Sequence, residues 1–158
     1  MRPYLYFVAC VAMGVAAQGA AAQEQDRRLG NWVETKVSAS YQGLRRSFED
    51  LGGGITRVNI AINDKGAALS SAELKCDGRP YPVLGSDRQP TETTLSCRTL
   101  NASTTEFTFV RSGGDSWIKS TGTERVSEDG EKMFVSAVQT DARGQVVERI
   151  ERVFVRKR

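Results

Sequence analysis

The chain has 158 residues, with 22 Lys and Arg, 19 Asp and Glu and a formal net charge of +3. It contains no histidine, which excludes Ser-His-Asp triads, Cys-His pairs, His proton shuttles and His-ligated metal sites. The charge is too balanced for the concentrated basic face that is typical of nucleic-acid-binding domains. We therefore expect a protein that is not an enzyme, with no cofactor, no metal and no nucleic-acid partner.

The N-terminal region has the pattern of an export signal. Arg2 precedes an apolar run from Leu5 to Ala17, and three small residues up to Ala22 follow as a cleavage site. The run is shorter than the about 20 residues that a membrane-spanning helix needs. We predict a signal peptide over residues 1–22, a single domain over residues 23–158, a periplasmic or secreted location and no membrane span in the mature form.

Turn signals follow at intervals of about 10 to 14 residues along the remaining chain. Asn and Asp tolerate turn conformations, and Gly adopts positive φ without a steric penalty. Each signal is therefore a candidate hairpin. The signals are LGGG (51–54), NDKG (63–66), CDGRP (76–80), LNAS (100–103), SGGD (112–115), SEDG (127–130) and DARG (141–144).

The segments between these turns alternate as half-buried strands do. Thr56, Val58 and Ile60 share one face of the first such segment, and Phe107 and Phe109 share a face of a later one. No segment after the signal shows a convincing helical period over ten residues. Eight to ten short strands predict an all-β, antiparallel up-and-down barrel, because closure removes exposed edges. A two-sheet sandwich is the alternative, although the turn spacing favours hairpins over long crossings.

Cys76 and Cys97 are the two cysteines that remain after the predicted signal, which contains Cys10. In an exported chain, a disulfide is the expected state of such a pair, with free thiols as the alternative. The segments that end in these cysteines could be neighbouring strands. Between them, two prolines hold Tyr81 extended, so that Tyr81 either caps the barrel mouth as a ligand contact or packs beneath the disulfide.

Four segments of the chain are similar, in the same order, to segments of small lipocalin-like exported bacterial proteins. They are GNWVETKVSASY (30–41), FEDLGGGITRV (48–58), DGRPYPVLGS (77–86) and RVSEDGEKMFVSAVQTDARGQ (125–145). The resemblance covers nearly the whole chain after the signal. It implies a calycin-type β-barrel, and it implies no particular activity, because members of this family are largely without one.

The resemblance also implies a role for one tryptophan. Trp32, with Gly30 before it, would lie where calycins place the tryptophan that closes one end of the barrel. The basic residue covering it would come from the last strand, with Arg149 or Arg152 as candidates. The two cysteines do not belong to the family pattern, so the disulfide would be a local addition.

The aromatic residues supply the candidates for a binding site. An eight-stranded barrel is either filled by its own side chains or holds one small ligand. If Trp117 points inward, its strand face continues with Lys119, Thr121, Thr123 and Arg125, which would suit an anionic or amphipathic ligand. The candidate cavity-lining residues are Trp32, Tyr81, Phe107, Phe109 and Trp117.

We predict a monomeric exported barrel that binds a small hydrophobic or amphipathic molecule. A cavity of about 300 Å³ or more, lined by Trp117, Phe107 and Tyr81, would favour this function. The alternative is a filled barrel that serves as a structural or protein-interaction module of the cell envelope. Two convergent carboxylates within a cavity would instead indicate an enzyme.

Overall fold

The computed structural model describes residues 26–35, 44–62, 65–113 and 117–158, so the predicted signal peptide and its cleavage site lie outside the described residues. These residues form ten antiparallel strands that close into a barrel in the order β1-β10-β9-β8-β7-β6-β5-β4-β3-β2. The predicted all-β up-and-down barrel is confirmed. The strands are β1 (Gly30–Glu34), β2 (Arg45–Gly52), β3 (Ile55–Ile62), β4 (Ala68–Leu74), β5 (Tyr81–Gly85), β6 (Pro90–Asn101), β7 (Thr104–Arg111), β8 (Ile118–Val126), β9 (Lys132–Asp141) and β10 (Val146–Lys157).

Five of the seven turn signals lie wholly within the described residues and coincide with connections between consecutive strands. Parts of the other two, residues 63–64 and 114–115, lie outside the described residues. The connection between β5 and β6, at residues 86–89, carries none of those signals. There the chain turns through Arg88, which has a φ of 62° although it is not a glycine. Left-handed φ is uncommon outside Gly, Asn and Asp, which is why the sequence predicts neither this turn nor β5 as a separate strand.

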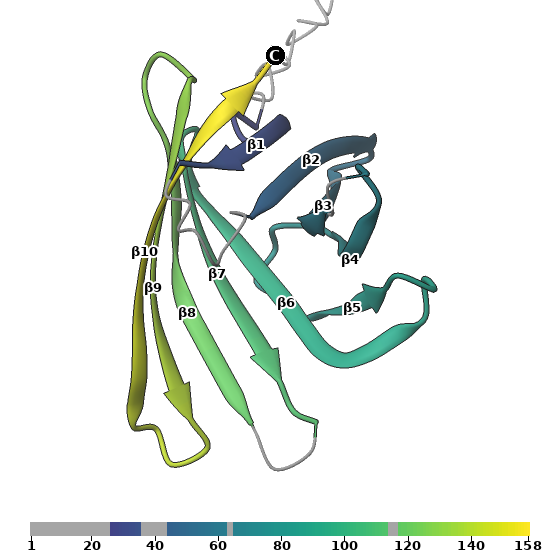
Figure 1. The fold of residues 1–158 in the computed structure, drawn as a ribbon, viewed down its shortest axis with the longest axis vertical. Helices are drawn as coiled ribbons and strands as arrows, with labels where there is room; N and C mark the ends of the chain where they lie inside the picture. The colour runs from purple at the N-terminus through teal and green to yellow at the C-terminus, as the bar shows by residue number, and fades with distance from the viewer. Residues whose placement is uncertain (1–25, 36–43, 63–64, 114–116) are drawn as a thin grey trace, which may run out of the picture.

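The barrel has a tall side and a short side (Figure 1). β6 to β10 form a long curved wall, with 12 residues in β6 and 12 in β10, whereas β5 has only 5. β1 and the end of β10 lie together at one end of this wall. Inward-facing apolar side chains from nearly every strand form one core, since successive residues of a strand point to opposite faces. The largest fully buried side chains are Trp32, Phe154, Leu74, Met133 and Val126.

Candidate functional site

Trp32 of β1 lies at one end of the barrel (Figure 1) and is fully buried. The register of β1 and β10 places Trp32 directly opposite Arg156, and the Arg156 guanidinium lies 4.3 Å from the centre of the indole ring. This is a cation–π contact at short range. The indole Nε1 donates a hydrogen bond of 2.7 Å to the Arg28 carbonyl oxygen. We call the end that Trp32, Arg28 and Arg156 occupy the closed end.

Arg156 ties three segments of the closed end together. Its guanidinium donates hydrogen bonds to the carbonyl oxygens of Arg27, Leu29 and Gly130. Gly30 leaves the room for this arrangement, because a Cβ at that position would lie 2.7 Å from Nη1 of Arg156 and its φ is 118°. A side chain at position 30 would therefore be both strained and in conflict with Arg156.

The expectation that Arg149 or Arg152 covers Trp32 is wrong. Arg149 is exposed on the outer face of β10. Arg152 shares the inner face, but it lies further along β10 from Trp32 and forms an ion pair of 3.5 Å with Glu34. The register of β1 against β10 decides which arginine meets Trp32, and that register is set by the whole barrel.

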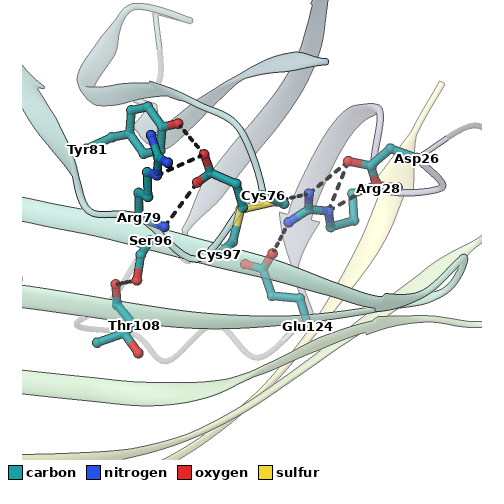
Figure 2. The surroundings of a disulfide bond; sticks show 10 residues. Asp26, Arg28, Cys76, Arg79, Tyr81, Ser96, Cys97, Thr108 and Glu124 are labelled. Atoms are coloured by element: carbon teal, nitrogen blue, oxygen red, sulfur yellow. Dashed lines mark hydrogen bonds and ion pairs between the residues drawn. A yellow bond between two sulfur atoms is a disulfide. The ribbon is translucent and has the colours of Figure 1, made fainter.

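Arg28 is a buried cation at the closed end of the barrel, with 4% of its surface exposed. Its Nε and Nη2 donate to the Asp26 carboxylate at 3.0 and 2.8 Å, and its Nη1 donates to Oε2 of Glu124 at 3.1 Å. Its guanidinium also lies 5.1 Å from the centre of the Phe48 ring. The other oxygen of Glu124 accepts a hydrogen bond of 2.8 Å from Nη1 of Arg46. Glu124 therefore joins two arginines, as Figure 2 shows for Arg28.

The charges of this network shift the pKa values of its members. Burial disfavours the charged form of Asp26, but the hydrogen bonds and positive charge of Arg28 outweigh it, so the pKa of Asp26 lies below its ordinary value. Burial likewise opposes the charge on Arg28, and the hydrogen bond and charge of Asp26, together with Glu124, outweigh it and raise the pKa of Arg28. Both groups stay charged near neutral pH.

The predicted disulfide between Cys76 and Cys97 is confirmed, with the two Cα atoms 4.5 Å apart. The two flanking segments are not neighbouring strands, because β5 lies between β4 and β6. They converge just beyond the end of β4, where Asp77 pairs with Arg98 and the Gly78 amide donates to the Cys97 carbonyl oxygen at 2.8 Å. A disulfide is typical of an oxidising compartment.

The disulfide belongs to the closed end. Nη2 of Arg28 lies 3.4 Å from the Cys76 sulfur, as Figure 2 shows. Tyr81 packs against the core near this corner, and its hydroxyl donates to Oδ2 of Asp77 at 3.1 Å. The backbone amide of Arg79 donates to the same carboxylate and, with Tyr81, lowers the pKa of Asp77. Tyr81 is thus held in the disulfide corner.

A cavity of about 160 Å³ lies inside the barrel. Two of the five residues predicted to line a cavity, Phe107 and Phe109, line this one, while Trp32, Tyr81 and Trp117 lie outside its lining. Buried side chains such as Phe48 form its deep part. Its apolar wall consists of Leu44, Phe48, Val58, Ile60, Leu74, Leu95, Cys97, Phe107, Phe109, Val135, Ala137 and Ile150.

The face of β8 that enters the barrel is the opposite of the one that Trp117 suggested. Lys119, Thr121 and Arg125 are exposed, whereas Ser120 and Glu124 are buried and line the cavity. A basic interior built from the Trp117 face is therefore wrong. The residues on the same face of β8 as Trp117 point outward. The polar groups of the interior come from the opposite face of that strand.

The polar part of the cavity lining consists of residues that the sequence does not predict to line a cavity: Arg28, Arg46, Ser120, Glu124 and Arg152. The signal that could have found two of them is strand periodicity, since Arg46 shares a face with buried Phe48, and Glu124 shares one with buried Val126. Charged residues in strands are normally assigned to the solvent face, so this signal conflicts with the usual assignment. Periodicity gives no position for Arg28, which precedes β1.

The lining contains one carboxylate, Glu124, and two arginines hold it. The described lining therefore does not contain two convergent carboxylates. Across residues 26–35, 44–62, 65–113 and 117–158, no group of three or more acidic or cysteine side chains is placed to hold a metal ion. Within the same ranges, no helix has the length and hydrophobicity needed to cross a bilayer.

No protein-family model matches this chain, and no curated protein matches it. The similarity to lipocalin-like proteins thus remains a resemblance between motifs. What the chain can do is therefore inferred from the barrel, the closed end and the cavity.

Proposed function

We propose that this protein binds one small hydrophobic or amphipathic molecule inside its barrel. The observation that carries the proposal is the cavity of about 160 Å³ with a mainly apolar wall. Apolar cavities of about 150 Å³ admit a molecule the size of benzene, whereas sites for drug-sized ligands measure about 300–1,000 Å³. The cavity is smaller than the size expected from the sequence, so the proposed ligand carries a single ring or a short branched chain.

The proposal extends to the setting of this binding. The protein acts as an exported monomer in an oxidising compartment, which the disulfide supports, and it carries or senses its ligand without altering it. A small closed barrel can hold one small ligand in its interior, because the closed sheet separates the ligand from water.

A second function, as a protein-interaction module of the cell envelope, is favoured by one feature of the surface. Val146 and Val147 are 53% and 54% exposed, side by side at the start of β10. A register shift between Val146 and Glu148 lets both consecutive side chains face solvent. Two exposed apolar residues form a small patch compared with those that mark binding surfaces, so we rank this function second.

Substitution of one cavity residue and of its neighbour on the outer face tests the proposed function. Ser120→Leu fills the cavity, and Thr121→Leu places the same side chain on the solvent face of β8. We expect toluene, benzyl alcohol and benzoate, titrated into the mature protein, to shift amide resonances of cavity residues. Ser120→Leu should weaken binding of these compounds about tenfold or more, and Thr121→Leu should leave it within about twofold.

Two results would contradict the proposal. Failure of every compound to bind the wild-type protein would indicate a filled barrel and favour the interaction module. Equal binding by both variants, each shown by circular dichroism to be folded, would place the ligand outside the cavity.

A further inference from the structure

The cavity has a charged side, formed by Arg28, Arg46, Arg152 and Glu124, which we call the charged wall. Three arginines and one glutamate therefore line the same small space. Charges of one sign that line a cavity with low-dielectric walls select ligands of the opposite sign. The charged wall thus favours an anion over a cation.

Two further carboxylates, which do not line the cavity, balance the positive charge of this wall. Asp26 holds Arg28 from the far side, where 30% of the Asp26 side chain is exposed, and Glu34 lies 3.5 Å from Arg152. The three arginines and three carboxylates sum to zero charge, but they are arranged unequally about the cavity. Only Glu124 among the carboxylates faces it, so the cavity side of the network is cationic.

Arg46 has unused hydrogen-bonding capacity in this wall. Its Nη1 donates to Glu124, and its guanidinium lies 5.3 Å from the centre of the Phe154 ring. Its Nε is buried and has no acceptor among the described residues. A buried donor without an acceptor costs stability, and an oxygen supplied by a ligand would remove that cost after a small rotation of the guanidinium.

Arg28 differs from Arg46 in this respect. Its Nε, Nη1 and Nη2 all donate to carboxylate oxygens of Asp26 or Glu124. A ligand oxygen at Arg28 would have to displace one of these partners, whereas at Arg46 it would add a partner. The geometry therefore favours Arg46 over Arg28 as the residue that a ligand would contact.

We propose that the ligand is a compact monoanion, a carboxylate on a single ring or a short branched chain, whose oxygens bind Arg46. This inference rests on the proposed function and specifies the ligand class for the same cavity. The apolar body packs on Phe107, Phe109 and Leu95, which line the cavity together with Arg46. The carboxylate accepts charge-assisted hydrogen bonds, which are about twice as strong as neutral ones.

Glu124 competes with such a ligand, because it already accepts a hydrogen bond from Arg46. Removal of the Arg46 charge and removal of the Glu124 charge should therefore change anion affinity in opposite directions. A purely structural role for the Arg28–Glu124–Arg46 cluster would instead make both substitutions weaken binding through loss of order. Opposite signs are thus the signature of direct contact.

Calorimetric titration of the mature protein with benzoate, benzyl alcohol and benzylamine tests the proposal, since the three probes share one ring and differ in charge. Benzoate should bind about tenfold tighter than benzyl alcohol, and benzylamine weakest. Arg46→Met should abolish this preference, so that benzoate and benzyl alcohol bind it with affinities within about twofold of each other. Glu124→Gln should tighten benzoate several-fold, and Arg57→Met, on the outer face of β3, should change nothing.

The outcomes separate the two proposals. Equal affinity for benzoate and benzyl alcohol overturns the anionic ligand and leaves the proposed function intact. Tightest binding of benzylamine also overturns it, because Glu124 would then dominate the wall. Failure of all three probes contradicts the proposed function itself. If Arg46→Met does not fold, the comparison of probes on the wild type and the sign of the Glu124→Gln effect decide the matter.

Discussion

At the closed end of the barrel, polar groups pair with one another, whereas in the cavity wall one hydrogen-bond donor remains for a ligand. Arg156 donates to backbone carbonyls and stacks on Trp32, and Arg28 is held by carboxylates on two sides. In the cavity wall, Arg46 keeps a buried donor with no acceptor among the described residues, beside an apolar surface. The same residue type thus stabilises the fold at one place and offers a binding contact at another.

The two regions therefore contribute differently, the closed end to the stability of the barrel and the cavity wall to ligand affinity. A satisfied buried cluster resists substitution, because removing one member leaves the others unpaired. Substitutions in a cavity wall that has space and unused donors cost less stability, and they change ligand binding instead. Variants of Trp32 and Asp26 should therefore lose stability, while variants of Arg46 should change binding first.

The largest effect is expected from Trp32→Ala. Trp32 is fully buried, contacts Arg156 and donates to the Arg28 carbonyl, so its truncation should cost about 3–5 kcal/mol of the free energy of unfolding. Trp117→Ala removes the other tryptophan, which is half-buried, and should cost less than about 1 kcal/mol. Urea unfolding followed by circular dichroism compares the two. Similar losses would show that the closed end has no special part in stability.

The disulfide should rank second. Replacement of both Cys76 and Cys97 by alanine opens a loop with a sequence separation of 21, which should cost about 3 kcal/mol through the entropy of the unfolded chain. Addition of dithiothreitol to the wild type is the matched control, and it should lower the melting temperature to that of the double variant. An unchanged melting temperature of the wild type in dithiothreitol would contradict the expected stabilising role of the disulfide.

The smallest effect, and the most diagnostic of the closed-end network, is the pH dependence contributed by Asp26. Its pKa is lowered in the folded state, so the stabilisation is fully present above the ordinary Asp pKa of about 3.9 and is lost as pH falls through the folded value. Asp26→Asn should cost about 2 kcal/mol at pH 7, and its difference in stability from the wild type should shrink as pH falls below about 3.9. A constant difference across that range would refute the ion pair with Arg28.

The sequence patterns were informative wherever a local rule operates. Turn residues marked the connections between strands, alternation marked the faces of β3 and β7, and two cysteines in an export context indicated a disulfide. The rules for turns and faces depend on a few adjacent residues, and the rule for the disulfide depends on the predicted export signal. The same rules predicted a barrel, because strands of that number and spacing leave exposed edges unless the sheet closes.

The functional assignments were less successful for a physical reason. Phe107 and Phe109 were placed in the lining because alternation and apolarity agree at these positions. Arg46 and Glu124 were missed because charge normally marks the outer face, and here two strands distant in sequence bring opposite charges together inside. The polar lining expected if Trp117 points inward is not found, because the alternate residues of β8, Ser120 and Glu124, are the buried ones.

Thus the amino-acid sequence by itself determined the class of fold, the positions of most turns and the covalent link at Cys76 and Cys97. Only the tertiary structure decided which arginine covers Trp32, which face of β8 lines the interior and that a charged wall borders a cavity of about 160 Å³. Turns and alternation arise from short-range sterics and solvation, which adjacent residues specify. Strand register and barrel closure arise from all ten strands at once, and the chemistry of the interior follows from them.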